Sequence, residues 1–345
     1  MAKFVDVEAE IPVTTVQLDG LVVMKIIKHS RETPGTAVGL LVGLDLDGTL
    51  EISNSFGLPV SADNDEKIIK TSGGRYEATM LRALREAQYD DTVIGFYQST
   101  TMGAFLRQSL ISTQASHHET LRQGGIALIH DVSSTARGNT SLRAFRLTKS
   151  FLSANKDGKF HVQSLIDHQV TFSTILEEVP VAVRSSVLLS AFLSTLSSNS
   201  QNLQASLSTP ALSPALSPST TSLLPSFAHM DGAPPTTLAR TMDALLETLD
   251  AQRTEENNIA FHSRQIARER ARADAYVQKR KEENAARLAQ GLSPLPEEDV
   301  ARLFKIPPEP GRLDSTLLLG QVDGYAKSLE AASAAAAVKL FVAQS

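Results

Sequence analysis

The sequence predicts an α/β fold built on a mixed sheet, followed by a helical region. Over residues 13–185, apolar β-rich runs alternate with segments of helical periodicity, and several connections are short enough for hairpins. A Ser- and Pro-rich segment comes next, and residues 234–343 then place apolar side chains at helical spacing. At 345 residues, the chain is long enough for one large core or for two domains.

The first region, 13–185, is expected to hold its strands and helices in a defined order. They are a strand at 16–19, a helix at 20–32, a hairpin at 37–60, a helix at 64–89 with a break at Ser72-Gly73-Gly74, a strand at 92–97, a helix at about 104–121, and extended segments at 125–131, 142–148, 160–166 and 175–183.

The hairpin has the clearest local signals. Val38 to Leu44 is an apolar run, Asp47-Gly48 is a turn dipeptide, and apolar residues continue beyond it. Gly39 and Gly43 inside the first arm predict bulges or close backbone contacts, because glycine otherwise weakens a strand. For the last segment, Pro180 predicts extended backbone, since it disfavours helix at the residue before it.

The remaining segments flank or connect the folded parts. Residues 1–12 are expected to be an N-terminal tail, and 186–197 an apolar helix after the core. Residues 198–233 are predicted to be a disordered linker, since this composition buries too little apolar surface to offset the entropy of ordering. Ser213 and Ser217, each followed by proline, are candidate phosphorylation sites or ordinary linker residues.

The helical region is predicted to contain a long helix at 234–290, a linker at 291–312 and a last helix at 313–343. Both helices carry narrow apolar stripes, and the last has an Ala-rich surface between its apolar residues. Helices of this kind cannot bury their apolar faces alone. We therefore expect them to need a partner.

Composition excludes several classes of function. The chain has no cysteine, so it can form neither a disulfide nor a thiolate metal site. Its net charge of −5 gives no overall attraction for nucleic acid. The N-terminus lacks the apolar stretch of a secretory signal, and no apolar run reaches the roughly 18 residues of a membrane span. We therefore expect a soluble cytoplasmic protein, in which the sequon at Asn139 is fortuitous.

The stretch at 92–111 has the layout of an active site but not its chemistry. An apolar run, Val93 to Tyr97, leads into the polar turn Gln98-Ser99-Thr100-Thr101, and Gly103 precedes an amphipathic segment. The side chains at this turn are amides and hydroxyls, with no acid, thiol or imidazole among them.

No other constellation supplies the missing groups. His117 and His118 point about 100° apart on a helix and cannot chelate one ion together. No nucleophile can be matched to His130-Asp131, which ends a strand. The sequence also lacks a P-loop, a G-x-S-x-G motif and an H-E-x-x-H motif.

The order of elements from 16 to 111 resembles the MPN domain, a family best known for the JAMM metalloproteases that cleave ubiquitin-like isopeptide bonds. The resemblance implies a mixed, curved sheet with flanking helices. In catalytic members, two His of a His-x-His strand end and the Asp of a following Ser-x-x-Asp hold zinc, and an earlier Glu is the general base. The frame is retained in Gly95-Phe96-Tyr97, Ser99 and Gly103.

The ligand positions that the resemblance identifies are not retained. The two His positions hold Gln98 and Thr100, the Ser position holds Gln108, the Asp position holds Ile111, and the Glu position holds Thr36. These side chains cannot hold zinc, which takes imidazole, thiolate or carboxylate donors. The expectation is therefore a protein with no catalytic residue, no metal and no cofactor.

Within the MPN family, residues 16–30, 39–60 and 95–114 are similar to one inactive MPN subunit of the eukaryotic translation initiation factor 3 complex. Gln98-Ser99-Thr100 is that subunit's own variant of the motif. This implies a scaffold that pairs its MPN domain with that of a second inactive MPN protein of the complex, its F subunit, and joins its C-terminal helices to a bundle with PCI-domain subunits. The complex binds the small ribosomal subunit, supports assembly of the 43S preinitiation complex and recruits mRNA.

Two other functions stay open at this point. The first is an inactive MPN subunit of the proteasome lid or of the COP9 signalosome. The second, from another class, is a zinc isopeptidase. Under the scaffold hypothesis, the interface candidates are apolar residues on helical stripes, of which the first three could equally belong to the core: Met80, Leu81, Leu84, Leu238, Met242, Leu245, Leu249, Leu317, Leu318 and Leu329.

The most charged feature is the segment from Arg264 to Lys281, with seven basic and two acidic residues. On a helix it could be a solvated face, or it could contact RNA phosphate or an acidic protein. The residues concerned are Arg264, Arg268, Arg270, Arg272, Lys279, Arg280 and Lys281.

Overall fold

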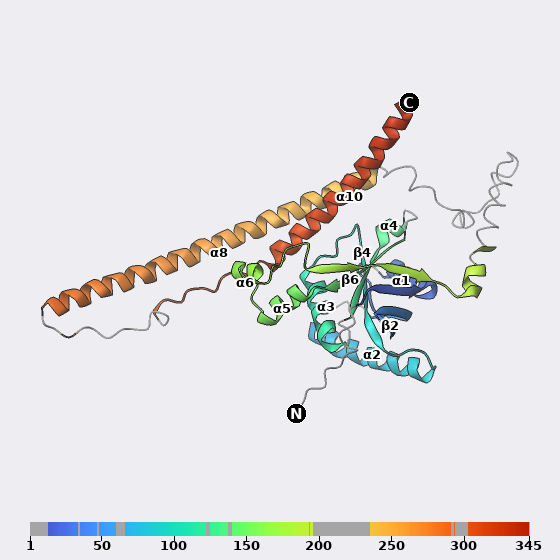
Figure 1. The fold of residues 1–345 in the computed structure, drawn as a ribbon, viewed down its shortest axis with the longest axis horizontal. Helices are drawn as coiled ribbons and strands as arrows, with labels where there is room; N and C mark the ends of the chain where they lie inside the picture. Colours follow the sequence, from blue (N-terminus) through green and yellow to red (C-terminus); the bar gives the residue numbers. More distant parts are fainter. Residues whose placement is uncertain are drawn as a thin grey trace.

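A computed structural model gives the fold of the chain (Figure 1). It describes residues 13–33, 35–46, 48–59, 66–121, 125–136, 140–192, 194–195, 235–290, 293 and 303–344. The expected tail at 1–12, the linker at 198–233 with Ser213 and Ser217, and the sequon residue Asn139 lie outside these residues.

The globular part contains eight strands and six helices within the described residues. In order they are β1 (Thr15–Asp19), α1 (Gly20–Glu32), β2 (Val38–Leu46), β3 (Thr49–Gly57), α2 (Glu66–Glu86), β4 (Val93–Thr100), α3 (Gln108–Thr120), β5 (Ile126–Asp131), α4 (Val132–Ala136), β6 (Ser141–Leu147), α5 (Lys149–Asp157), α6 (Val162–Asp167), β7 (Leu176–Val179) and β8 (Val181–Arg184). Two long helices follow, α8 (Pro235–Ala289) and α10 (Leu313–Gln344).

The strands form one mixed sheet in the order β7-β6-β5-β4-β2-β3-β1-β8. Pairings β1–β3, β1–β8 and β4–β5 are parallel, and the others are antiparallel. The outermost strands β7 and β8 are separated in sequence only by Pro180. One extended segment therefore pairs with β6 at one end of the sheet and with β1 at the other. The sheet must curve round to make this possible, which confirms the predicted mixed sheet.

The hairpin glycines have the predicted roles. Gly48, at a φ of 85°, forms the turn between β2 and β3. A side chain at Gly39 would collide with the carbonyl oxygen of Phe56 and the ring of Tyr97. The register of β2 against β3 shifts between Val42 and Gly43. These close contacts let β2 lie between β3 and β4 with aromatic side chains packed beside it.

Three clusters of buried apolar side chains hold the elements together. One packs α1 on one face of the sheet and includes Val22, Ile26, Leu41 and Leu128. Another includes Phe96, Phe105, Leu110 and Ile129, with Met80, Leu81 and Leu84 of α2 packed against it. The last joins α3, α5 and α6 to the start of α10 and includes Ile111, Phe151, Leu165, Leu313 and Leu317.

The two long helices partly cover each other. Gln252 of α8 donates a hydrogen bond to Ser315 of α10 at 3.0 Å, and Ile259 and Ile266 of α8 are buried. Figure 1 shows both helices extending beyond the globular part in opposite directions. The expectation that these stripes need a partner is thus met in part within the chain itself. None of the helices among the described residues has the length and apolar character needed to span a membrane.

Three local expectations were wrong. Residues 162–167 form the helix α6 rather than a strand, because Leu165 is buried at helical spacing from Val162 and Gln163 donates to Asp167 one turn later. Helix α2 runs through Ser72-Gly73-Gly74 without a break, since glycine weakens a helix interior but does not end it. Helix α3 begins at Gln108, later than expected.

Candidate functional site

The end of β4 is the part of the chain where the MPN resemblance locates a metal site. Gln98 lies opposite Ile129 of β5, and Thr100 lies opposite Asp131. Because side chains alternate along a strand, Gln98 and Thr100 share one face, while Tyr97 and Ser99 point to the other. The spacing that would let two side chains of β4 reach the same ion is therefore present.

The five residues at the ligand and base positions do not converge as donors. Ile111 is 2% exposed and packs within the cluster shared by α3, α5 and α10. Thr36 and Gln108 are exposed, and Gln98 is half-buried. Thr100 is buried, and its hydroxyl has no hydrogen-bond partner. An aliphatic side chain in the core therefore stands where a metal-binding carboxylate would be required.

The residue types do not fit zinc. Hydroxyl and amide oxygens at these positions are weak donors for an ion that prefers imidazole, thiolate or carboxylate. Among the described residues, no group of three or more His, Asp or Glu side chains is arranged to hold a metal ion. We therefore assign no zinc-dependent step to this strand end.

The polar residues at this strand end instead organise the backbone. The hydroxyl of Ser99 accepts a hydrogen bond from the Ala37 amide at 2.7 Å, and the Ser99 amide donates to the Ala37 carbonyl. After β4 the chain turns through Met102 and Gly103, both with positive φ. The Met102 amide donates to the Asp131 carboxylate at 3.1 Å. The Asp131 carboxylate thereby ties the turn after β4 to the end of β5.

Helix α10 closes over the same turn. Gln321, buried at 6% exposure, donates from its amide nitrogen to the Gly103 carbonyl at 3.0 Å. Its side-chain oxygen accepts from the Leu106 amide at 3.3 Å. These two bonds connect residues more than 200 positions apart in sequence. The turn after β4 is thus a joint between the globular part and the C-terminal helix.

Two ionisable side chains beside this strand end are held neutral by burial. His130 is fully buried, hydrogen-bonded through Nδ1 to the Ser141 carbonyl at 3.2 Å, and burial lowers its pKa. Burial also raises the pKa of the Tyr97 hydroxyl, which lies 2.8 Å from His29 Nδ1. Each of these two side chains is thus held in a contact within the globular part, His130 with the Ser141 carbonyl and Tyr97 with His29.

A Ser-His-Asp arrangement that the sequence did not suggest occurs on the surface. Ser153 lies 3.3 Å from His168 Nδ1, and His168 Nε2 lies 2.9 Å from Asp157. The hydroxyl of Ser153 donates instead to the Ser150 carbonyl, and Ser153 and Asp157 are exposed. These contacts join α5 to the end of α6. For Ser153 to act as a nucleophile, its hydroxyl would have to donate its hydrogen bond to the imidazole of His168. A sheltered site for the carbonyl group of a substrate would also have to lie beside it.

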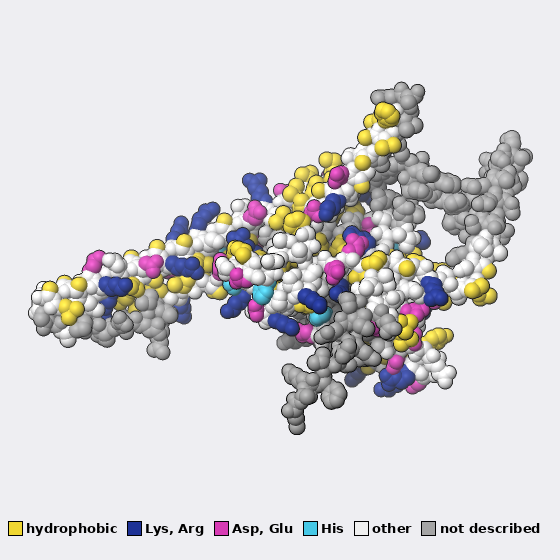
Figure 2. All heavy atoms as spheres, viewed as in Figure 1, with side chains coloured by type: hydrophobic (Ala, Val, Ile, Leu, Met, Phe, Trp, Pro, Cys, Tyr) yellow, Lys and Arg dark blue, Asp and Glu magenta, His cyan; other side chains and the backbone are white. Residues whose placement is uncertain are grey.

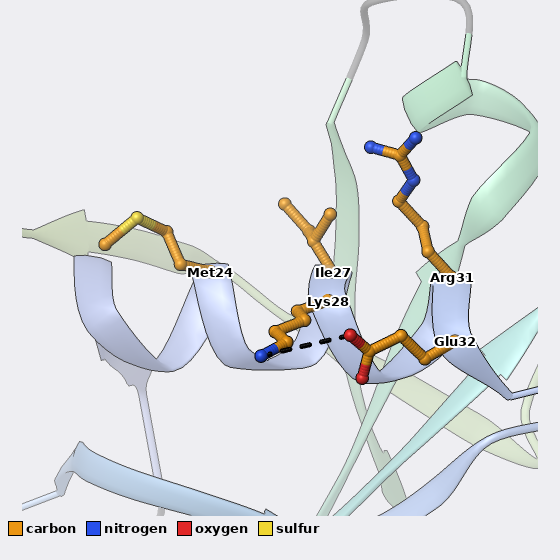
Figure 3. A pocket seen from close by; sticks show the side chains of 5 residues that line it. All are labelled: Met24, Ile27, Lys28, Arg31 and Glu32. Carbon is orange, nitrogen blue, oxygen red and sulfur yellow. Dashed lines mark ion pairs between the residues drawn. The ribbon is translucent and has the colours of Figure 1, made fainter.

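A shallow hollow on α1 also lacks the features of a site. It is lined by Met24, Ile27, Lys28, Arg31 and Glu32, with Lys28 and Glu32 3.9 Å apart (Figure 3). All five residues belong to one helix, so within the described part of the chain no second element brings polar groups towards a ligand.

The interface candidates fall into four groups in the structure. Leu317 is 2% exposed in the core, so it is not available to a partner. The stripe of Met80, Leu81 and Leu84 is half-buried against the sheet, which accounts for these side chains within the chain. Leu245, Leu318 and Leu329 are half-buried, and Leu238, Met242 and Leu249 are exposed.

The three exposed candidates on α8 belong to a longer apolar row, which also contains a residue that was not among the candidates. Leu238, Met242, Leu246 and Leu249 follow at four-, four- and three-residue spacing, and Leu246 is 60% exposed. We call these four residues the α8 apolar stripe. Figure 2 shows hydrophobic side chains gathered where α8 and α10 lie together. Leu246 belongs to the same helical repeat as Leu238 and Met242 in the sequence, although it was not among the interface candidates.

The basic segment lies on α8 as predicted, and most of it is exposed. Arg272 pairs with Glu269 at 2.7 Å, and Arg280 lies 3.7 Å from Glu283. Arg280 is half-buried, whereas the other six residues are exposed, namely Arg264, Arg268, Arg270, Arg272, Lys279 and Lys281.

Two known families match the sequence. Residues 12–122 match the family described as JAB1/Mov34/MPN/PAD-1 ubiquitin protease. Residues 135–220 and 219–345 match the family described as the C-terminal region of eIF3h. The first match covers the strand end described above, and the second covers α8 and α10.

Curated relatives are similar over nearly the whole length. The H subunit of eukaryotic translation initiation factor 3 from Mycosarcoma maydis is 45% identical over 346 residues, covering 96% of this chain and 86% of that protein. The proteins of the same name from Aspergillus niger and Sclerotinia sclerotiorum are each 38% identical, covering 97% of this chain and 96% of theirs. Among solved structures, DSY2949 from Desulfitobacterium hafniense is similar, with 12% identity and a TM-score of 0.33 over 50% of this chain and 94% of that one. A likeness at this level establishes neither fold nor function.

Proposed function

The chain belongs to the eIF3h family, the H subunits of eukaryotic translation initiation factor 3, and we propose that it acts as a non-catalytic scaffold of that complex. The H subunit from Mycosarcoma maydis matches nearly the whole chain. The two matching families cover the MPN domain and the helical region. The scaffold role, its partners and its cytoplasmic location are our inference from that membership and from the surfaces described here.

The absence of catalysis is supported by the chemistry at the end of β4. Ile111 occupies the position of a metal-binding carboxylate and is packed in the core, and Thr100 offers only a hydroxyl. Substituting a single residue could not rebuild a zinc site, because each of the positions that the MPN resemblance assigns lacks its donor. The same turn is instead bonded to α10 through Gln321.

The observation that supports assembly most strongly is the α8 apolar stripe. Its four side chains stay exposed although the same helix already packs against α10 through another face. A contiguous apolar row on a helix is typical of a surface that another helix covers. We propose that this stripe joins a helical bundle with PCI-domain subunits of the complex. Val338, Leu340 and Phe341, exposed near the end of α10, could extend the same bundle.

Pairing with the second MPN protein, the F subunit, would use the globular part. An apolar surface is available there on α1, where Leu21 and Met24 are exposed. The neighbouring helical residues 187–192 expose Val187, Leu188 and Phe192, and Leu189 packs against the start of α1. We propose this surface, rather than Met80, Leu81 and Leu84, for the MPN pairing, because the latter three already pack against the sheet. Through these contacts the chain would support 43S preinitiation complex assembly and mRNA recruitment on the small ribosomal subunit.

Purification of the tagged chain from native cytosol tests this proposal. We expect the other initiation factor 3 subunits, the F subunit and the PCI-domain subunits among them, to elute with the chain in equal amounts. Elution with proteasome-lid or COP9 signalosome subunits would favour the alternative assemblies, and a solitary chain would contradict a scaffold role.

A metal and activity assay separates the scaffold from an isopeptidase. The pure chain is expected to contain no stoichiometric zinc after dialysis against a zinc buffer and to leave ubiquitin chains intact. One tightly bound zinc ion per chain together with cleavage would contradict the non-catalytic role.

A further inference from the structure

The outward face of α8 carries a row of basic side chains, Arg264, Arg268, Arg272 and Lys279, all exposed. We call these four residues the α8 basic stripe. Arg264 and Arg268 each lie two residues from the buried Ile266, so at about 100° per residue they project from the opposite side of the helix. The row extends over about 22 Å at a rise of about 1.5 Å per residue. Figure 2 shows Lys and Arg side chains set along α8.

The acidic residues of the segment neutralise only one of these four cations, because Glu269 pairs with Arg272. Asp274 lies about 200° round the helix from Arg272, on the opposite side. Glu269 is half-buried and lies about 100° from Arg268, where it pairs with Arg272. Among the described residues, Arg264, Arg268 and Lys279 have no ion pair. The stripe is therefore a concentrated positive surface on a chain whose net charge is −5.

An exposed aromatic ring continues the row. Phe261 lies one turn before Arg264 on the same face and is 64% exposed. The sequence-based prediction took only the segment from 264 onward into account, where Tyr276 is the one aromatic, and Tyr276 is half-buried with its ring 5.5 Å from that of Phe304. An exposed aromatic beside a line of arginines is the combination that holds single-stranded nucleic acid, since the ring stacks on a base while the cations follow the backbone.

We propose that the α8 basic stripe and Phe261 bind single-stranded RNA through its phosphate backbone and one stacked base. Arginine presents a planar fork of donors that matches phosphate oxygens. The three arginines recur at about one helical turn, and Lys279 follows about two turns later. An acidic protein helix fits this face less well. Apart from Phe261, the apolar side chains of this face are only Ala271 and Ala275, so a protein partner would bury little apolar surface between the basic side chains. RNA needs no such surface, because counterion release supplies most of its binding free energy.

Binding of a fluorescent ~20-nucleotide oligouridylate to the purified full chain, followed by anisotropy, tests the proposal. Four phosphate contacts predict an affinity that falls about 50-fold between 50 and 200 mM salt. The variant Arg264→Gln/Arg268→Gln/Arg272→Gln/Lys279→Gln should lose most of this affinity and of its salt dependence. A matched variant, Arg75→Gln/Arg82→Gln/Lys156→Gln/Lys159→Gln, removes the same charge from exposed positions of the globular part and should bind like the natural chain. Circular dichroism checks that both variants keep their helices.

The ring at Phe261 provides a second, independent readout. Phe261→Ala should weaken binding on the order of tenfold, with an unchanged salt dependence, because stacking does not involve counterions. Phe261→Leu keeps apolar bulk without the ring and should lose as much. The proposal is overturned by no binding at 50 mM salt or by equal losses in the two charge variants. It is also overturned if polyglutamate competes as well as the RNA while Phe261→Ala has no effect, a result that assigns the stripe to an acidic protein.

Discussion

The end of β4 and the first half of α8 differ in what their side chains contact within the chain. At the strand end, Ser99 is bonded to Ala37, and the Met102–Leu106 turn is bonded to Asp131 and Gln321. On α8, the apolar stripe remains exposed over three turns. Sites of chemistry usually leave polar groups open to a ligand, and sites of assembly leave apolar groups open. Of these two regions, the one whose side chains remain open to a partner is the apolar stripe on α8.

The comparison depends on α10 being packed into the core at its start. Leu317→Ala should lower the free energy of unfolding by about 2–5 kcal/mol, because it leaves a cavity among α3, α5 and α10. Leu319→Ala, two residues along and 43% exposed, is the matched control and should change it by less than about 0.5 kcal/mol. Urea denaturation measures both. Equal effects would mean that α10 does not dock as described.

The joint between α10 and the turn after β4 is the next contact to break. Gln321→Leu should cost about 1–3 kcal/mol, since it leaves the half-buried Leu106 amide without its partner and the Gly103 carbonyl with only the bond from the Phe105 amide. Hydrogen exchange at the Leu106 amide should accelerate as well. Gln278→Leu, on the exposed surface of α8, provides the control. Unchanged hydrogen exchange at the Leu106 amide in the Gln321→Leu variant would show that these two hydrogen bonds do not hold α10 to the turn after β4.

The buried His130 makes stability depend on pH. Burial lowers its folded pKa, so the unfolded chain takes up a proton first as the pH falls through about 6.5. Stability is therefore lost towards acid pH, by about 1.4 kcal/mol for each unit that separates the two pKa values. Denaturation between pH 7 and 5 should show a flatter slope for His130→Gln than for the natural chain. A slope for His130→Gln equal to that of the natural chain would sink this assignment.

Ser99 and Thr100, adjacent on β4, allow a hydroxyl that makes a hydrogen bond to be compared with one that makes none. Thr100→Val should be neutral or slightly stabilising, because the Thr100 hydroxyl is buried without a partner and valine has nearly the same shape. Ser99→Ala should cost about 1 kcal/mol, because it removes the acceptor of the Ala37 amide. A loss at Thr100→Val as large as that at Ser99→Ala would indicate a role for Thr100 that the structure does not show.

Much of the sheet could be predicted from the sequence, and the parts that failed have physical reasons. Apolar runs and the Asp47-Gly48 turn were sufficient for the hairpin, because strand pairing there is local. Residues 162–167 were misassigned because a short run with apolar residues three and four apart fits both periods. The MPN fold and the initiation factor 3 family were both confirmed. That confirmation rests on a resemblance, since periodicity alone gives no family.

The candidate site was less predictable. Replacement of the ligand types is visible in the sequence, but Gln321 is bonded to residues more than 200 positions away, and no local pattern reveals such a contact. The same limit explains Leu317, which has the spacing of an interface residue and is buried by the chain itself.

The most direct test compares the two regions in one experiment. In cells without the natural copy, the tagged chain would carry either Met242→Asp/Leu246→Asp on the α8 apolar stripe or Gln98→Ala/Gln108→Ala at the end of β4. We predict that the α8 variant loses its PCI-domain subunits by at least about tenfold on purification, whereas the strand-end variant keeps them in full. Retention of these subunits by the α8 variant, together with their loss from the strand-end variant, would contradict the account.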